Sequence, residues 1–249
     1  MAGFFKKYRA SDPKLDFLNW DGSGDLDVIR KMSKSRDVLR TEFEKSQQKL
    51  DCALVAAKSS HQILRKPARS RNSYRAAMLC QSMDPPSRID VKSNTQIAAD
   101  ANLFHDAKLS EITLRQVSNN NPKSGCAFSV GIDVLKFSGD YISISFALPE
   151  DFWKASEAKD LIKVDLNVQL EAQAECYLRL NTNDGPNVSS ITQDINALGK
   201  DERITFDPTQ LEANPPNTAV WIDLIVNDPE YNQVKINEFA VHRTVKAEI

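Results

Sequence analysis

Apolar and polar side chains alternate along several stretches between residues 104 and 243. The clearest run is 141–148, where isoleucine, phenylalanine and leucine alternate with serine and alanine; 163–170, 176–181 and 220–226 show the same period. Because successive side chains of a strand point to opposite faces, a period of two predicts sheets with one face in a hydrophobic core.

Further stretches with strand character bring the expected number of strands to about nine. These stretches are 109–117, 126–137, 188–195, 202–207 and 233–243. The breaks between them are rich in Asn, Asp, Gly and Pro, which are typical turn residues. The pattern predicts a mainly β protein, an antiparallel jelly-roll β-sandwich with an N-terminal α-helical extension. A short helix is expected at 150–159, directly after Pro149.

The N-terminal third has a different character. Residues 1–83 carry a charge balance of +8 and residues 84–249 one of −10. From Leu26 to about Ile63 the spacing of apolar residues is helical, with one stripe that needs a partner surface. The stripe consists of Met32, Leu39, Phe43, Leu50, Ala53 and Ala57. We therefore expect a helical segment at 1–63, a basic linker at 64–99 and the β-sandwich domain at 100–249.

Residues 52–83 contain basic side chains and no acidic one. Such a segment could bind phosphate groups of nucleic acid or lipid, or it could be a solvated linker that lies against the acidic domain. Aromatic residues are sparse there and no nucleic-acid motif is present, so nucleic acid is not an expected partner. The basic residues are Lys58, Arg65, Lys66, Arg69, Arg71 and Arg75.

The expected location is cytoplasmic, with at most peripheral membrane attachment. No apolar run approaches the roughly 18 residues of a membrane helix. Residues 1–10 combine three aromatic with three basic residues, which suits either docking on an anionic membrane surface or packing back on the protein. The four cysteines are widely spaced without a C-x-x-C pair, as expected for buried thiols in a reducing compartment.

Several ordered motifs of the strand region resemble an uncharacterised bacterial family, a domain of unknown function. The resemblance covers roughly residues 100–249, and a basic helical lead before it matches in character. The resemblance implies no activity; at the level of fold the domain is also similar to galactose-binding-like and carbohydrate-binding jelly rolls. The motifs are Leu103-Phe104-His105-Asp106, Leu109 to Gln116, Leu180-Asn181 with Gly185-Pro186-Asn187, Trp221 to Ile225, Glu230 to Val234, and Arg243 to Ile249.

Catalytic signatures are missing from the sequence. It contains no nucleophile elbow, zinc-protease motif, phosphate loop or dinucleotide fingerprint. We expect no catalytic residues and no cofactor, and we assign no metal ligands. A pair of carboxylates for glycoside hydrolysis stays open because Asp and Glu are plentiful. Sandwiches of this kind can hold a structural calcium, and Glu238 on the final strand is the residue to inspect for it.

The strongest candidate for a binding site is a set of polar strand residues. If Leu166, Leu178 and Ile222 face the core, residues of the opposite phase form an outer face with aromatic rings, acceptors and an arginine. Sugars are recognised by such chemistry, since an aromatic plane covers the apolar ring face and polar groups bind the hydroxyls. The alternative is that the N-terminal helix covers this face and Trp221 packs against it. The candidate residues are Asp165, Asn167, Tyr177, Arg179, Asn181, Trp221 and Asp223.

Three functions follow as hypotheses. The first is a non-catalytic binding module that recognises a glycan through the sheet face, as a lectin does, or a protein partner. The second is a structural or assembly protein whose helix drives homo-oligomerisation. The third is a polysaccharide hydrolase.

Overall fold

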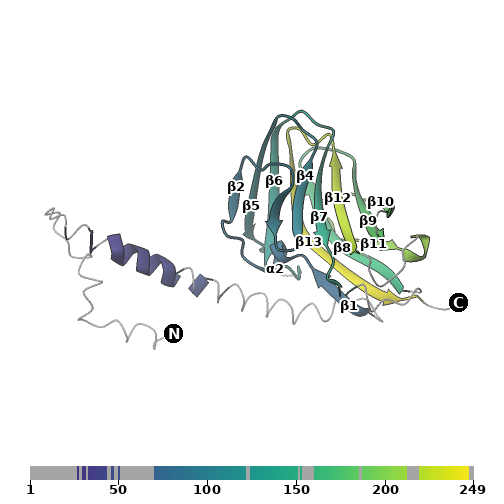
Figure 1. The fold of residues 1–249 in the computed structure, drawn as a ribbon, viewed down its shortest axis with the longest axis horizontal. Coiled ribbons are helices and arrows are strands. Elements are labelled where there is room, and N and C mark those ends of the chain that lie inside the picture. The colour runs from purple at the N-terminus through teal and green to yellow at the C-terminus, as the bar shows by residue number, and fades with distance from the viewer. Residues whose placement is uncertain are drawn as a thin grey trace. The chain divides into compact units, whose positions relative to one another are not determined.

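The computed structural model divides the chain into two units, Met1–Leu50 and Asp51–Ile249. Figure 1 gives the order of the elements along the chain. The residues that the structure describes are 27, 30, 31, 33–43, 46, 47, 50, 70–121, 124–150, 152, 160–184, 187–211 and 219–246.

In the first unit, every described residue between 27 and 50 is helical, which confirms the predicted N-terminal helix over that range. Two residues of the predicted apolar stripe, Phe43 and Leu50, are exposed, and Leu39 is half-buried. The other stripe residues, Met32, Ala53 and Ala57, lie outside the described residues. No helix in the described part of the chain combines the length and apolarity needed to cross a bilayer.

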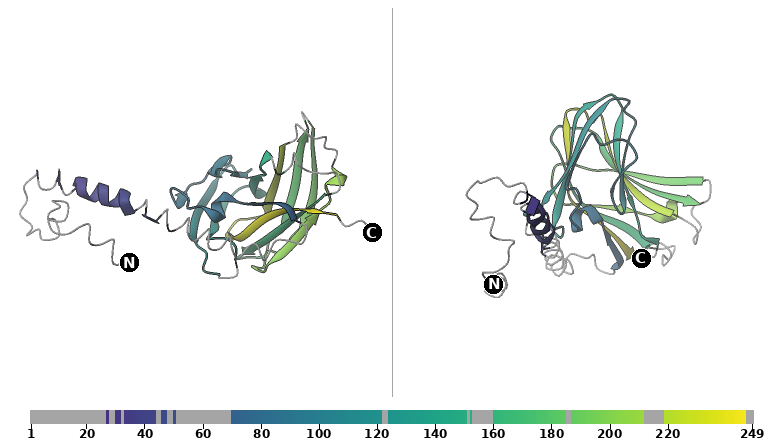
Figure 2. Two further views of the ribbon diagram at one scale, coloured as in Figure 1. Left: turned by 90° about the horizontal axis from the view of Figure 1, so that it is seen from below. Right: turned by 60° about the vertical axis from the view of Figure 1, so that its left-hand side comes forward.

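The second unit is an antiparallel β-sandwich of jelly-roll type with a seven-stranded and a six-stranded sheet. Figures 1 and 2 show the two layers from three directions. The seven-stranded sheet contains β1 (Ser70–Arg75), β2 (Ser87–Ile89), β5 (Ser110–Ser118), β6 (Phe128–Phe137), β8 (Asp160–Leu170), β11 (Glu202–Phe206) and β13 (Asn232–Val245). The six-stranded sheet contains β3 (Thr95–Ala98), β4 (Ala101–His105), β7 (Tyr141–Ala147), β9 (Cys176–Asp184), β10 (Asn187–Asp194) and β12 (Ala219–Asn227).

The order of strands differs from their order in sequence, as a jelly roll requires. The first sheet runs β11-β8-β13-β6-β5-β2, and the second runs β10-β9-β12-β7-β4-β3. The strand β13 is 14 residues long and pairs with β8 along most of its length. On its other side β13 pairs first with β6 and then, from Ala240 to Thr244, with β1.

The core lies between the sheets and contains the inward-facing residues that the alternation predicted. Leu166, Leu178 and Ile222 are all buried, so the predicted phase of β8, β9 and β12 is confirmed. The rings of Phe146 from β7 and Phe239 from β13 stack across the sandwich with centroids 4.0 Å apart. Each buried aromatic ring of this kind contributes several kcal/mol relative to a cavity, about 3–5.

The segment expected as a basic linker, 64–99, supplies part of the sandwich from residue 70 onward. It contributes three strands, β1 to β3, and the short helix α2 (Ala77–Cys80). Two of its arginines lie against acidic residues of the sandwich: Arg71 Nε is 3.8 Å from Asp160 and Arg75 Nη1 is 3.4 Å from Glu238. These two arginines therefore neutralise carboxylates of the sandwich.

Two smaller elements complete the description. A 3₁₀ turn, η3 (Pro208–Gln210), begins at Asp207, whose carboxylate accepts from the Thr209 backbone N–H at 3.1 Å. Of the helix expected at 150–159, only residues 150 and 152 are described, and both are helical. The remainder of that prediction lies outside the described residues.

Candidate functional site

The outer face of the six-stranded sheet carries a cavity of about 810 Å³, which we call the sheet groove. Four strands supply its floor: β4, β7, β9 and β12. The segment that follows β7 also lines the cavity. The lining residues are Phe104, Tyr141, Ser143, Ser145, Ala147, Leu148, Pro149, Glu150, Arg179, Ala219, Val220, Trp221 and Asp223.

Strand register arranges these side chains in rows across the sheet. Trp221 lies opposite Ala147, and Asp223 lies opposite Ser145 on the same side of β12. Two residues further along β7, Ser143 lies opposite Phe104. The step from the Trp221 row to the Phe104 row is four residues, or about 13 Å at roughly 3.3 Å per residue. The groove therefore has an aromatic ring near each end and polar groups between them.

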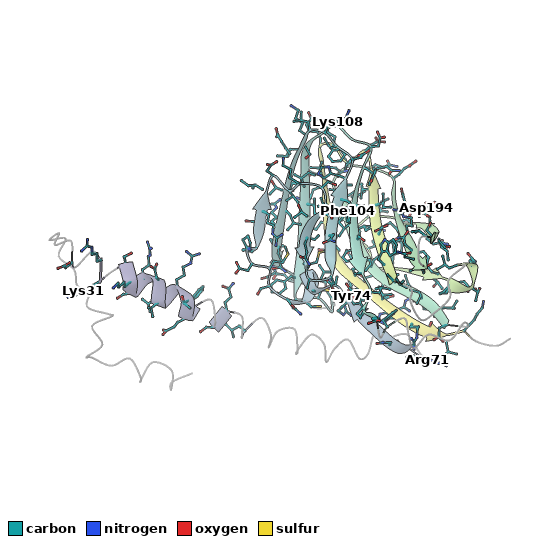
Figure 3. All side chains as sticks on the ribbon, viewed as in Figure 1. Lys31, Arg71, Tyr74, Phe104, Lys108 and Asp194 are labelled. Carbon is teal, nitrogen blue, oxygen red and sulfur yellow. The ribbon has the colours of Figure 1, made fainter. Side chains whose placement is uncertain are left out.

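Figure 3 labels Phe104 on β4 and Asp194 at the end of β10, so the reader can follow the breadth of this sheet. Tyr141 adds a second ring beyond Phe104 and is 38% exposed. Both rings lie on the open face of the sheet, where water reaches them. Exposed or half-exposed aromatic rings along a groove favour stacking with a ligand.

A hydrogen-bond network fixes the middle of the groove. Asp223 is buried, and its Oδ2 accepts from Arg179 Nη2 at 3.0 Å and from Asn181 Nδ2 at 2.9 Å. Asn181 also donates to the Arg179 carbonyl at 3.0 Å. The other carboxylate oxygen, Oδ1, has no donor among the described residues, although Asp223 lines the groove. The site thus holds a charged acceptor in a fixed orientation with one oxygen available.

Five of the seven predicted site residues share this outer face. Arg179, Trp221 and Asp223 line the groove itself. Asn181 is buried beside it and orients Asp223. Tyr177 lies opposite Ile225 on the next row of the sheet and is half-buried. The alternation in the sequence predicted one shared face for these five residues, and they share it because β9 and β12 are direct neighbours.

The other two predicted site residues, Asp165 and Asn167, lie elsewhere. They belong to β8 in the seven-stranded sheet, so the expectation that all seven share one face is wrong. Asn167 Nδ2 donates to the Gly199 carbonyl at 3.0 Å and to Asp201 at 2.8 Å, while its Oδ1 accepts from Asn237 at 3.0 Å. Its amide therefore joins β8 to β13 and to the loop before β11.

Asp165 is part of a chain of polar contacts across four strands of its sheet. Arg203 Nη2 donates to Asp165 Oδ2 at 2.7 Å, and His242 Nε2 lies 3.4 Å from the same oxygen. His242 Nδ1 in turn shares a hydrogen bond of 2.9 Å with the Ser73 hydroxyl. Burial raises the pKa of Asp165, but the hydrogen bonds from Arg203 and His242 outweigh it and lower the pKa to about 2.

This lowered pKa gives a prediction for stability. The folded pKa lies below the usual value near 3.9, so Asp165 stabilises the fold above about pH 4 and loses this effect as the pH falls through about 2. Asp165→Asn should therefore cost about 1–2 kcal/mol at neutral pH, discounted because Arg203 is partly exposed, and the deficit should shrink between about pH 4 and 2. Urea unfolding as a function of pH measures it. Exposed Asp140→Asn is the control, and an equal, pH-independent deficit in both variants would contradict the assignment.

Glu238, the residue inspected for calcium, has protein partners. Its Oε1 is 3.4 Å from Arg75 Nη1, and its Oε2 accepts from the Ser124 hydroxyl at 3.5 Å. Among the described residues, no group of three or more His, Cys, Asp or Glu side chains is arranged to hold a metal ion. The contacts of Glu238 are those of a buried ion pair.

Sequence reasoning missed the β4 and β7 side of the groove. Phe104, Tyr141, Ser143 and Ser145 line it but were not among the candidates. The alternation in 141–148 did place the serines on the outer phase. The missing information was that β7 lies next to β12, because neighbours in a jelly roll are far apart in sequence.

Solved structures with a similar fold include an active domain, a binding module and a glycosidase. The enzymatically active domain of tailspike protein 4 from bacteriophage CBA120 has a TM-score of 0.39 and 12% identity, over 57% of this chain and 19% of that chain. The family 11 carbohydrate-binding module from Clostridium thermocellum, in complex with a β-1,3-1,4-mixed-linked tetrasaccharide, has a TM-score of 0.37 and 10% identity, over 65% of this chain and 98% of that chain. An arabinose-bound α-L-arabinofuranosidase has a TM-score of 0.40 and 15% identity, over 62% of this chain and 25% of that chain. The chain therefore spans only a small part of the tailspike domain and of the arabinofuranosidase, but nearly all of the carbohydrate-binding module.

No curated protein matches the sequence. The model of a family of unknown function, DUF6478, matches residues 18–249. This match confirms the resemblance to an uncharacterised family in the strand region. It also reaches beyond residue 100 toward the N-terminus, so it includes the described helical residues.

Proposed function

The chain belongs to the DUF6478 family of unknown function, and we propose that it is a non-catalytic module that binds a carbohydrate chain in the sheet groove. The observation that carries this proposal is the composition of the groove. Aromatic rings lie near both ends, and Ser145, Asp223 and Arg179 lie between them. This arrangement matches the two sides of a sugar ring, whose C–H face is apolar and whose edge carries hydroxyls.

The dimensions of the groove suit an oligosaccharide. A cavity of about 810 Å³ is within the range of small-molecule sites, and it is open along the sheet. The span of about 13 Å between the Trp221 and Phe104 rows, at roughly 3.3 Å per residue, accommodates more than one sugar unit. A chain of sugars would lie with one ring against Trp221 and another near Phe104.

The polar floor supplies hydrogen bonds with fixed geometry. Asp223 is held by Arg179 and Asn181 through one oxygen, which leaves Oδ1 to accept from a sugar hydroxyl. Because the network is formed before the ligand arrives, little side-chain entropy is lost on binding. Hydrogen bonds to a charged acceptor are also stronger than those between neutral groups.

The same network favours binding over hydrolysis. Glycoside hydrolysis commonly uses two carboxyl groups that flank the scissile bond, one of which must carry a proton. Among the described residues that line the groove, the carboxyl groups are those of Asp223 and Glu150. Asp223 Oδ2 already accepts hydrogen bonds from Arg179, whose guanidinium nitrogen Nη2 is 3.0 Å away, and from Asn181. These contacts favour a role for Asp223 as a hydrogen-bond acceptor for a ligand over a role as the acid in hydrolysis.

A glycan array probed with the full chain tests the proposal. We expect binding to a subset of neutral oligosaccharides, confirmed by calorimetry. Because stacking and short-range hydrogen bonds dominate, the affinity should change by less than about threefold between about 0.05 M and 0.5 M NaCl. A strongly salt-dependent affinity would instead indicate a charged partner. A folded sample that binds no neutral, acidic or amino sugar at millimolar concentration would overturn the proposal.

A further inference from the structure

An arginine on β2 lies on the inner face of the sandwich. Arg88 pairs with Leu114 of β5, and residues directly opposite each other in an antiparallel pair have their side chains on the same face. Leu114 is fully buried in the core. The Arg88 side chain therefore begins on the core side of the seven-stranded sheet, where an arginine without a partner is rare.

The guanidinium of Arg88 reaches from one sheet to the other. β2 is the last strand of the seven-stranded sheet, at its edge in Figure 1, and β3 is the last strand of the six-stranded sheet. Arg88 Nη1 donates to the Gln96 carbonyl on β3 at 2.6 Å. Arg88 Nε is buried and has no hydrogen-bond partner, and among the described residues no carboxylate pairs with this arginine. A buried donor of a charged group is thus left unsatisfied, which is costly and uncommon.

A cavity of about 320 Å³ lies beside this guanidinium, and we call it the edge cavity. Arg88 and Gln96 line it, together with the apolar residues Met78 and Ile97. Asp84 also lines it and is exposed, so the edge cavity is reached from solvent. Its volume is near the lower end of the range for small-molecule sites, about 300 Å³. It shares no lining residue with the sheet groove.

One side chain from β5 fixes the wall that follows α2. Gln116 Nε2 donates to the carbonyl groups of Met78 and Gln81, both at 2.7 Å, and its Oε1 accepts from the Met83 backbone N–H at 2.7 Å. The Gln116 backbone N–H donates to the Pro86 carbonyl, also at 2.7 Å. The wall of the edge cavity is therefore formed before a ligand arrives, which lowers the entropy cost of binding.

We propose that the edge cavity binds a small organic carboxylate, whose charged group pairs with Arg88 and whose hydrocarbon part packs against Met78 and Ile97. With Nη1 engaged by Gln96, the Nε and Nη2 edge of the guanidinium faces a ligand, and these two donors match the two oxygens of a carboxylate. The apolar wall favours an organic acid over an inorganic anion, because hydrocarbon gains from leaving water. The proposal does not depend on the carbohydrate site.

Asp84 gives the edge cavity a second electrostatic property. Its exposed carboxylate lines the same cavity and repels an anion that is bound to Arg88. Asp84→Asn should therefore strengthen carboxylate binding by about 1.5- to 5-fold at low salt, the range of exposed charge pairs. Arg88→Gln should weaken it by at least about tenfold, because a charge-assisted pair of hydrogen bonds is lost.

An NMR titration of the full chain tests the proposal. The Nε–H signal of Arg88, identified by its loss in Arg88→Gln, reports on the unpartnered atom itself, and backbone amide signals of the cavity wall report on binding in the variants. Sodium butanoate is the probe, butanamide is its neutral analogue, and sodium acetate lacks most of its hydrocarbon. We expect a saturable shift with butanoate and a dissociation constant of about 1–10 mM. Acetate should bind more weakly, and butanamide should not shift the Nε–H signal.

Arg115→Gln is the matched control. Arg115 lies on β5, next to β2, but it is 3.0 Å from Asp133 in an ion pair and is largely exposed. This variant should bind butanoate as the wild type does. Trp221→Ala should do so as well, which separates the edge cavity from the sheet groove. Circular dichroism establishes that each variant is folded, and Asp84→Asn with the butanamide comparison decides the matter if Arg88→Gln does not fold.

Four results would overturn the proposal. The first is an Arg88 Nε–H signal that does not move at high millimolar butanoate. The second is an equal shift with butanoate and butanamide, which would show that charge is not recognised. The third is tighter binding of inorganic phosphate than of butanoate. The fourth is weaker binding of butanoate by Asp84→Asn than by the wild type.

Discussion

Replacing Trp221 with alanine should lower the affinity of the sheet groove for its oligosaccharide by at least about 30-fold, which corresponds to a binding hot spot of about 2 kcal/mol. Trp221 lines the groove on the outer face of β12, opposite Ala147, so its ring is available to a ligand. It is half-buried and lies outside the core between the sheets, so the melting temperature should stay within a few degrees of the wild type. Calorimetry with a sugar identified on the array measures the affinity.

A second aromatic residue provides the matched control. Tyr231 is 75% exposed in the turn between β12 and β13, with a φ of 55°. Asparagine tolerates positive φ, so Tyr231→Asn removes an exposed ring without backbone strain. This variant should bind as the wild type does. If Trp221→Ala instead unfolds the domain, or binds with unchanged affinity, then Trp221 is a packing residue and the groove is not the site.

Replacing Phe239 with alanine should destabilise the sandwich by about 3–5 kcal/mol. The ring is fully buried and stacks on Phe146 at 4.0 Å with an angle of 18° between planes. Because Phe239 belongs to β13 and Phe146 to β7, this pair joins the two sheets. Its removal leaves a cavity that neighbouring strands cannot fill without shifting.

Urea unfolding measures this loss, and Leu135→Ala is its control. Leu135 is on β6 but is 55% exposed, so its truncation should change the unfolding free energy by less than about 0.5 kcal/mol. Equal effects of both substitutions would contradict the assignment of Phe239 to the centre of the core. Phe239→Leu, which retains more apolar volume, should be destabilised less than Phe239→Ala.

The fold was largely predictable from hydrophobic period. All nine strands expected from the sequence occur, and most of them bury one face and so display the period of two in their residues. The strands that sequence reasoning missed, β1 to β4, are short, with three to six residues each. In such short strands few residues alternate, and polar residues such as Asn72 and Ser73 obscure the period.

The site was predictable only in part, for a physical reason. Alternation shows which side chains point away from the core, so Asp165 and Asp223 were both correctly placed on an outer face. It does not fix which sheet a strand joins, since this depends on pairings between distant segments. Asp165 lies on one outer face of the sandwich and Asp223 on the other.

The long strand β13 also constrains how this domain can be made. It lies inside the seven-stranded sheet, where β8, β6 and β1 all pair with it. A ribosome synthesises β13 after every other strand of the sandwich. Until β13 has been made, the edges of β1, β6 and β8 that pair with it have no backbone hydrogen-bond partner from β13. Completion of the sheet then joins β1 to a segment about 170 residues later in the chain. Folding of the sandwich is therefore expected to finish only after β13 has been synthesised. Until then the unpaired strand edges must be protected from pairing with other chains.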